Sequence, residues 1–166
     1  VRKAADGLGQ LTKNILDFSK IEAGSFQLDM QPVPLSETVD GVLRMFTDQA
    51  HAKNIELSSA FAGDVPPSLF GDRARLRQVL TNLIGNAVRH TPAGTPVEVA
   101  VGTAPGDEGS MGSVIEVRDH GPGLDDESAD KVFERFFRAD PSRQRGRGGG
   151  TGLGLSIVAA VAASHG

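Results

Sequence analysis

Two asparagine side chains are spaced so that they could hold a cation together. Asn82 and Asn86 lie four residues apart in a segment with helical periodicity, so both side chains are expected on one face of a helix. Carboxamide oxygens are ligands that Mg²⁺ accepts beside phosphate oxygens. Arg89 and His90 continue the same polar edge, where an arginine could bind a phosphate. Two solvated asparagines on an exposed face are the alternative interpretation.

A carboxylate and two glycines form a second candidate group. Asp119 follows the strand predicted at 114–118, where it could accept a hydrogen bond from an exocyclic amine such as that of adenine. Gly121 and Gly123 permit positive φ angles and close approach of the backbone to a flat ligand. Taken alone, the pattern also fits an ordinary glycine-containing turn.

A glycine-rich run precedes the last expected helix. Of the 21 glycines, six lie between positions 146 and 154, directly before an apolar helical pattern. Backbone N–H groups at a helix start bind anions, so a phosphate-binding role is favoured over a linker. The run contains neither the Gly-Lys pair of a Walker motif nor G-x-G-x-x-G. Cations precede and enter it at Arg135, Arg138, Arg143, Arg145 and Arg147.

Alternating helices and strands are expected to position these groups. Apolar residues at helical spacing predict a helix over 72–90, which Thr91-Pro92 stops. Strands joined as hairpins favour an α+β two-layer sandwich over a doubly wound parallel sheet. The other predicted elements are a short edge strand within 25–35, a helix from a cap at Ser36 to about 53, strands at 55–61, 97–101 and 114–118, a helix at 126–137, a loop at 138–150, and a last helix at 153–163 capped by Thr151.

The composition limits the class of protein. A chain of 166 residues has room for one ordinary domain. Its 17 basic and 21 acidic residues give a net charge of −4, which argues against general nucleic-acid binding. The absence of cysteine excludes disulfides and thiolate metal sites. The longest apolar stretch is far shorter than the ~20 residues of a membrane span, so no membrane contact is expected.

The first residues predict a helix of a bundle or coiled coil over 5–23. Leu8, Leu11, Ile15 and Phe18 step by three, four and three residues, and Gly24 ends the pattern. An ordinary amphipathic helix is the alternative. A single helix cannot bury its apolar stripe alone, so a partner chain or another segment is expected in either case.

In their order, these motifs resemble the catalytic ATP-binding domain of sensor histidine kinases, in the Bergerat (GHKL) superfamily. The resemblance implies an α/β sandwich with ATP between helices and a mixed sheet. It divides the chain into 1–24, the end of a dimerisation and phosphotransfer hairpin, and 25–166, the ATP-binding domain. The matching segments are Leu80 to Ala87 for the N box, 119–124 for the G1 box, 133–138 for the F box, 150–155 for the G2 box, and 17–24 for the end of the hairpin.

The resemblance implies a site for ATP and Mg²⁺. It assigns Mg²⁺ to Asn86, with Asn82 close by, and the adenine amine to Asp119. Residues 124–150 would form a lid over the nucleotide. The full set implied to bind nucleotide is Asn82, Asn86, Arg89, His90, Asp119, Gly121, Gly123, Leu124, Arg138, Gly150, Thr151, Gly152, Leu153, Gly154 and Leu155.

The implied reaction is transfer of the γ-phosphate of ATP to a histidine in two-component signalling. The family's acceptor histidine precedes an acidic residue, a context that none of His51, His90, His120 and His165 has. The acceptor helix is therefore expected upstream of residue 1, and this chain is not expected to phosphorylate itself. The family's final strands are also expected to be missing, which would leave an open sheet edge and weaken the fold.

The resemblance further implies partners and a location. A response-regulator receiver domain would take the phosphoryl group, and the parent protein would form a homodimer through the N-terminal helix. The domain would lie in the cytoplasm. The alternatives are another ATPase or a serine kinase of the same fold, and a non-catalytic ATP-binding or scaffolding module. The first is disfavoured because residues 72–90 contain no glutamate to activate water, and the second because every binding motif is intact.

Overall fold

The chain forms two units in the computed structural model, which describes residues 12, 16, 19, 27–105, 111–138 and 152–165. One unit is Asp29–Gly123, and the other combines Val1–Leu28 with Leu124–Gly166. Among the helices in these described ranges, none has both the length and the apolar character that a membrane span requires.

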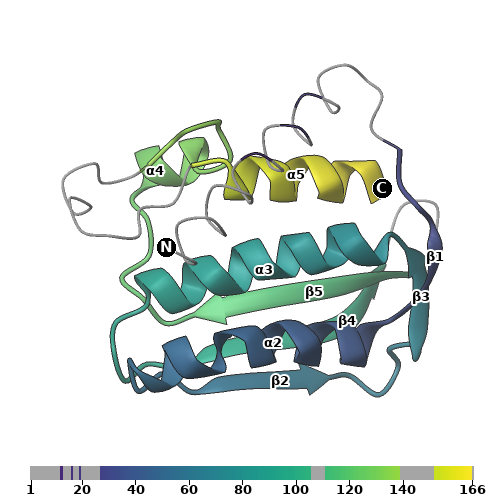
Figure 1. The fold of residues 1–166 in the computed structure, drawn as a ribbon, viewed down its shortest axis with the longest axis horizontal. Coiled ribbons are helices and arrows are strands. Elements are labelled where there is room, and N and C mark those ends of the chain that lie inside the picture. The colour runs from purple at the N-terminus through teal and green to yellow at the C-terminus, as the bar shows by residue number, and fades with distance from the viewer. Residues whose placement is uncertain are drawn as a thin grey trace. The chain divides into compact units, whose positions relative to one another are not determined.

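The unit Asp29–Gly123 has two layers, with two helices covering one face of a three-stranded sheet (Figure 1). The sheet order is β2-β4-β5, in which β2 runs parallel to β4 and β4 runs antiparallel to β5. A separate antiparallel ribbon joins β1 and β3. This arrangement confirms the predicted α+β sandwich. The elements are β1 (Gln31–Pro34), α2 (Leu35–His51), β2 (Leu57–Phe61), β3 (Ser68–Gly71), α3 (Arg73–His90), β4 (Val97–Pro105) and β5 (Met111–Asp119).

Apolar side chains of both helices meet the sheet in a buried core. Alternate residues of β4 face inward, and the apolar stripe of α3 packs against them, as its helical spacing predicts. Gly85 allows α3 to approach α2, because a Cβ atom there would lie 3.1 Å from the ring of Phe46. The largest buried cluster contains Leu35, Val39, Val42, Leu80, Ile84, Val88, Val99 and Val101.

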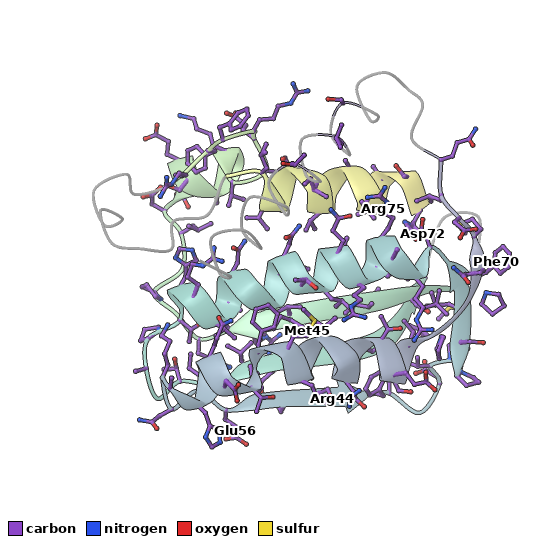
Figure 2. The ribbon with its side chains drawn as sticks, viewed as in Figure 1. Arg44, Met45, Glu56, Phe70, Asp72 and Arg75 are labelled. Carbon is purple, nitrogen blue, oxygen red and sulfur yellow. The ribbon has the colours of Figure 1, made fainter. Side chains whose placement is uncertain are left out.

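The start of α3 is held by a buried carboxylate. Asp72 is the N-cap, and its Oδ1 accepts the N–H of Arg75 at 3.0 Å. Its Oδ2 accepts the N–H of Asp29 at 3.0 Å, which ties the segment before β1 to the helix start. Figure 2 shows Asp72 and Arg75 at this end of α3. One aspartate therefore satisfies a free helix N–H and a distant main-chain donor.

The second unit contains α4 (Asp126–Lys131) and α5 (Gly154–His165). The N-cap of α4 is Asp125, whose Oδ1 accepts the N–H of Ser128 at 2.7 Å. Hydrogen bonds from Ser128 hold the pKa of Asp125 below its usual value. Ahead of α5, the carbonyl oxygen of Gly152 accepts the N–H of Phe136 at 2.9 Å.

Several predicted boundaries are wrong. Helix α2 begins at Leu35 after Pro34, and the N-cap makes no side-chain hydrogen bond, so Ser36 is not the cap. The helix predicted at 126–137 ends at Lys131, and Phe136 has φ of +58°, which a helix does not allow. Strand β3 was not predicted. Both hairpin strands extend beyond the predicted 97–101 and 114–118. The last helix begins at Gly154 and runs to His165, instead of 153–163.

Two predictions lie largely outside the described residues. The N-terminal helix at 5–23 is described only at residues 12, 16 and 19, which are helical. The apolar seam residues of that helix, the cap at Thr151 and most of the loop at 138–150 are not among the described positions. The division of the chain after residue 24 therefore stays a prediction.

Candidate functional site

The C-terminal half of α3 carries four predicted site residues. Asn82 and Asn86 are half-buried. They do not belong to the core, to which α3 contributes Leu80, Ile84 and Val88. Arg89 and His90 are exposed in the last turn. The structure confirms that these polar residues share one helix and that its apolar stripe lies elsewhere. Asn82 and Asn86, four residues apart, lie one above the other.

The turn after β5 presents one oxygen of a carboxylate. Asp119 is exposed, and its Oδ1 accepts the N–H of Gly121 at 2.8 Å. In the part of the chain that the structure describes, Oδ2 has no hydrogen-bond partner, so it can accept from another donor. A Cβ atom at Gly121 would lie 2.7 Å from Oδ1. Glycine is therefore required here to leave the carboxylate in place.

The two glycines of this turn have different roles. Gly123 has φ of +74°, as the sequence predicts. Gly121 does not have a positive φ, so of these two glycines only Gly123 uses the backbone freedom that glycine permits. Its lack of a side chain matters because of the nearby carboxylate and not because of its backbone angles.

The end of α3 and the turn after β5 lie next to one another. The Cβ position at Gly121 is 3.8 Å from Cδ of Pro92, two residues beyond His90. Partial burial of the imidazole, together with the charges of Arg89 and Lys53, lowers the pKa of His90, and the charge of Asp119 opposes this effect. Together these effects favour the neutral form of the imidazole.

The described residues suit a cation whose ligands come mainly from a bound phosphate compound and from water. They contain no group of three His, Asp or Glu side chains placed to bind a metal ion. The carboxamides of Asn82 and Asn86 are neutral oxygen donors on one face. They fit Mg²⁺, which retains several waters and takes few protein ligands where phosphate oxygens supply the rest.

The predicted lid and phosphate-turn residues belong to the second unit. Leu124 and Arg138 are exposed. Gly152 has φ of +70°, and Gly154 and Leu155 begin α5. The side chain of Leu153 is 1% exposed, so only its main chain is available to a ligand. Gly150 and Thr151 lie outside the described residues.

A main-chain contact within this second unit is not predicted from the sequence. A Cβ atom at Gly152 would lie 2.7 Å from both Cα and the carbonyl carbon of Phe136. Since backbone atoms cannot move aside as a side-chain tip can, glycine is required at 152 for two reasons, its positive φ and this contact. Nothing in the spacing of the two motifs indicates that they touch.

A cavity of about 620 Å³ lies along α2 and the turn into β2. It contains none of the predicted site residues. Figure 2 labels two of its lining residues, Arg44 on α2 and Glu56 before β2. Acidic Asp40 and Glu56 beside Arg44 make it poorly suited to a polyphosphate.

Comparison with known proteins places the predicted motifs within a recognised family. The model of the family described as histidine kinase-, DNA gyrase B-, and HSP90-like ATPase matches residues 71–166. All the predicted site residues, from Asn82 to Leu155, lie inside this range.

Similar proteins carry matching names. The chain is 43% identical over 145 residues to sensor histidine kinase GacS of Pseudomonas protegens, and 35% identical over 145 residues to signal transduction histidine-protein kinase BarA of Escherichia coli K12. Each match covers 87% of this chain but only 16% of the relative. The crystal structure of full-length ShkA in complex with AMPPNP is similar, with a TM-score of 0.80 and 31% identity. That match covers 98% of this chain and 32% of the other.

Proposed function

The chain belongs to the histidine kinase-, DNA gyrase B- and HSP90-like ATPase family and is the ATP-binding catalytic domain of a sensor histidine kinase, and we propose that Asp119 and the end of α3 hold the ATP. We further propose that the γ-phosphoryl group passes to a histidine elsewhere in the longer protein. The observation that carries the proposal is the turn at Asp119, whose carboxylate is oriented by Gly121 beside the last turn of α3.

Asp119 would recognise the base. Its Oδ2 can accept a hydrogen bond from the exocyclic amine of adenine, while Gly121 holds Oδ1. Guanine has a carbonyl oxygen at the corresponding position, and two acceptors repel each other. Asp119 therefore favours adenine over guanine. Gly123, with its positive φ and nothing within 4 Å of its Cβ position, would leave room for the base.

The end of α3 would bind the phosphates. Bound Mg·ATP supplies the phosphoryl group and neutralises part of its charge, and such transfers depend mainly on positioning and charge stabilisation. Asn86 would hold the ion, with Asn82 one turn before it on the same face. Arg89 would add a fixed positive charge. His90 would serve as a hydrogen-bonding group, and the effects that lower its pKa favour the neutral imidazole. Phosphate-binding roles are also proposed for Arg138 and for the main chain at Gly152, which has a positive φ.

The wider context is also a proposal. The acceptor would be a histidine of the longer protein, because none of the four histidines here is followed by an acidic residue. A response-regulator receiver domain would then take the phosphoryl group. Residues 1–24 would contribute to a homodimer, and the use of ATP and a receiver partner favours a cytoplasmic location. Labelling the longer protein with γ-³²P-ATP tests the reaction, and label that survives replacement of every upstream histidine would contradict it.

Base recognition is tested by calorimetric titration with ATP, GTP and adenosine. Loss of a hydrogen bond to a charged group costs about 1.5–3 kcal/mol, so Asp119→Asn should weaken ATP and adenosine binding roughly 10- to 100-fold. The thermal melt should hardly change, because Asp119 is exposed. Asp48→Asn, another exposed aspartate, is the matched control and should bind as the wild type does. Equal affinity for ATP and GTP, or unaltered binding by Asp119→Asn, would remove Asp119 from the base site.

The metal assignment has a separate test. Asn86→Ala should lower the affinity for ATP in the presence of Mg²⁺ while leaving the affinity for adenosine within about twofold, since adenosine carries no phosphate to share the ion. The adenosine titration is thus the internal control. Equal losses for both ligands would show that Asn86 supports the pocket and does not bind the ion.

A further inference from the structure

Lys53 reaches across 35 residues to the end of the helix that carries the proposed phosphate site. Its Nζ donates hydrogen bonds to the carbonyl oxygens of Val88 at 2.8 Å, Arg89 at 3.0 Å and Thr91 at 2.8 Å. An ammonium group has three N–H donors, so these bonds use all of them. The last carbonyl groups of a helix have no hydrogen-bond donors within the helix, and the Lys53 ammonium group supplies these donors.

The turn between α2 and β2 directs Lys53 to this place. The N–H groups of Lys53 and Ile55 both donate to the carbonyl oxygen of Ala50, at 3.0 and 2.9 Å. Asn54 between them has φ of +52°. The carbonyl oxygen of Lys53 also accepts the N–H of Gly94 at 3.0 Å. Both the main chain and the side chain of Lys53 are therefore bound to the segment that ends α3.

That segment connects the two halves of the proposed site. Arg89 carries one of the carbonyls that Lys53 binds, His90 lies between two of them, and Pro92 directly follows the last. Pro92 in turn lies beside the Gly121 turn that orients Asp119. A shift of the segment would move the phosphate-binding end of α3 relative to the adenine-binding carboxylate.

We propose that Lys53 is a positioning residue of the nucleotide site, which fixes the last turn of α3, with Arg89 and His90, against the turn that carries Asp119. Its role toward nucleotide depends on the proposed function, but its contacts with α3 do not. The sequence motifs do not predict this role for Lys53. Lys53 is 29 residues before Asn82 and has no place in the N box.

His90 provides a readout that needs no nucleotide. Burial of its ring, Arg89 and Lys53 lower its pKa, and Asp119 raises it. Removing the Lys53 charge should therefore raise the pKa of His90. An NMR titration of the imidazole protons in the 166-residue chain measures this directly, and His120 and His165 serve as internal references.

The binding test compares variants of Lys53 with a control at the other end of α3. Lys53→Met should reduce the ratio of ATP to adenosine affinity roughly 10-fold, because displacing the end of α3 would weaken a charge-assisted phosphate contact and leave the contact with the base. Lys53→Arg keeps a cation with several donors and should restore most of that ratio and the low pKa of His90. Arg73→Met removes an exposed cation that lies 3.8 Å from Glu37, and it should change neither readout.

The outcomes separate this inference from the proposed function. If the wild-type chain binds no ATP, the proposed function fails, and the His90 titration still tests the placement of Lys53. An unchanged pKa of His90 in folded Lys53→Met overturns the inference. The inference is also overturned if Lys53→Met weakens ATP and adenosine binding equally and Lys53→Arg does not restore that binding. Such a result would indicate that Lys53 only stabilises the fold. If Lys53→Met does not fold, Lys53→Gln replaces it, because its amide can still donate to two of the carbonyls.

Discussion

Replacing Gly152 by alanine tests the contact between the two motifs of the second unit. Two costs add at this position. The φ of +70° is unfavourable for a residue with a Cβ atom, by about 1–2 kcal/mol. The new Cβ would also lie 2.7 Å from two backbone atoms of Phe136. Forcing extra volume into a tightly packed place costs about 1–3 kcal/mol, so Gly152→Ala should destabilise by about 2–5 kcal/mol in total.

Gly94→Ala is the matched control. Gly94 has φ of +81°, but nothing lies within 4 Å of its Cβ position. Only the conformational cost applies there, about 1–2 kcal/mol. The excess for Gly152→Ala over Gly94→Ala is thus the cost of the contact alone, about 1–3 kcal/mol.

Urea unfolding followed by circular dichroism measures the free energy of unfolding of both variants. Amide hydrogen exchange adds a local readout, because α5 begins two residues after Gly152. We expect faster exchange in α5 for Gly152→Ala and wild-type exchange there for Gly94→Ala. If both variants lose the same stability and α5 exchanges as in the wild type, the close approach of Gly152 to Phe136 does not hold the second unit together.

Three further changes have expected outcomes. Asp72→Ala removes an N-cap and leaves the N–H of Asp29 unpaired, so urea unfolding should show a loss of about 2–3 kcal/mol, whereas Asp72→Asn should lose less. Gly121→Ala should weaken adenosine binding about 10-fold by displacing one hydrogen-bonding carboxylate, yet leave the melt nearly unchanged, because the carboxylate of Asp119 can rotate away. Because the pKa of Asp125 is lowered, its carboxylate cap stabilises α4 at neutral pH, and this stabilisation is lost as the pH falls through that pKa. Amide hydrogen exchange in α4 should therefore increase over that acidic range in the wild type, and Asp125→Asn should not show the same increase.

The parts of the site that the sequence predicts well depend on local periodicity. The apolar stripe through Leu80 and Ile84 places Asn82 and Asn86 away from the core, because a helix turns about 100° per residue. The end of an alternating apolar strand likewise places Asp119 at the sheet's edge. Such relations need only neighbouring residues, so one sequence suffices to predict them.

The wrong predictions occur where the local structure depends on contacts with distant segments or on competing local signals. Strand β3 has only four residues and exists through its pairing with β1, more than 30 residues earlier. At the start of α2, Ser36 is a good cap by type, but Pro34 already has the extended conformation of an N-cap, with φ of −71° and ψ of 109°. The left-handed conformation of Phe136 accompanies its contact with Gly152, which no local pattern reveals.

The same distinction separates the identity of the site residues from their arrangement. Motifs select residues by type, and Asp119 or Asn86 can be recognised without knowing what holds them. Their arrangement depends on residues outside the motifs, since Lys53 holds the end of α3 from the turn after α2. Substituting Lys53 should therefore change how well ATP is distinguished from adenosine while every motif residue is intact. A chain with all four motifs but without such a support would bind the base and lose selectivity for the phosphates.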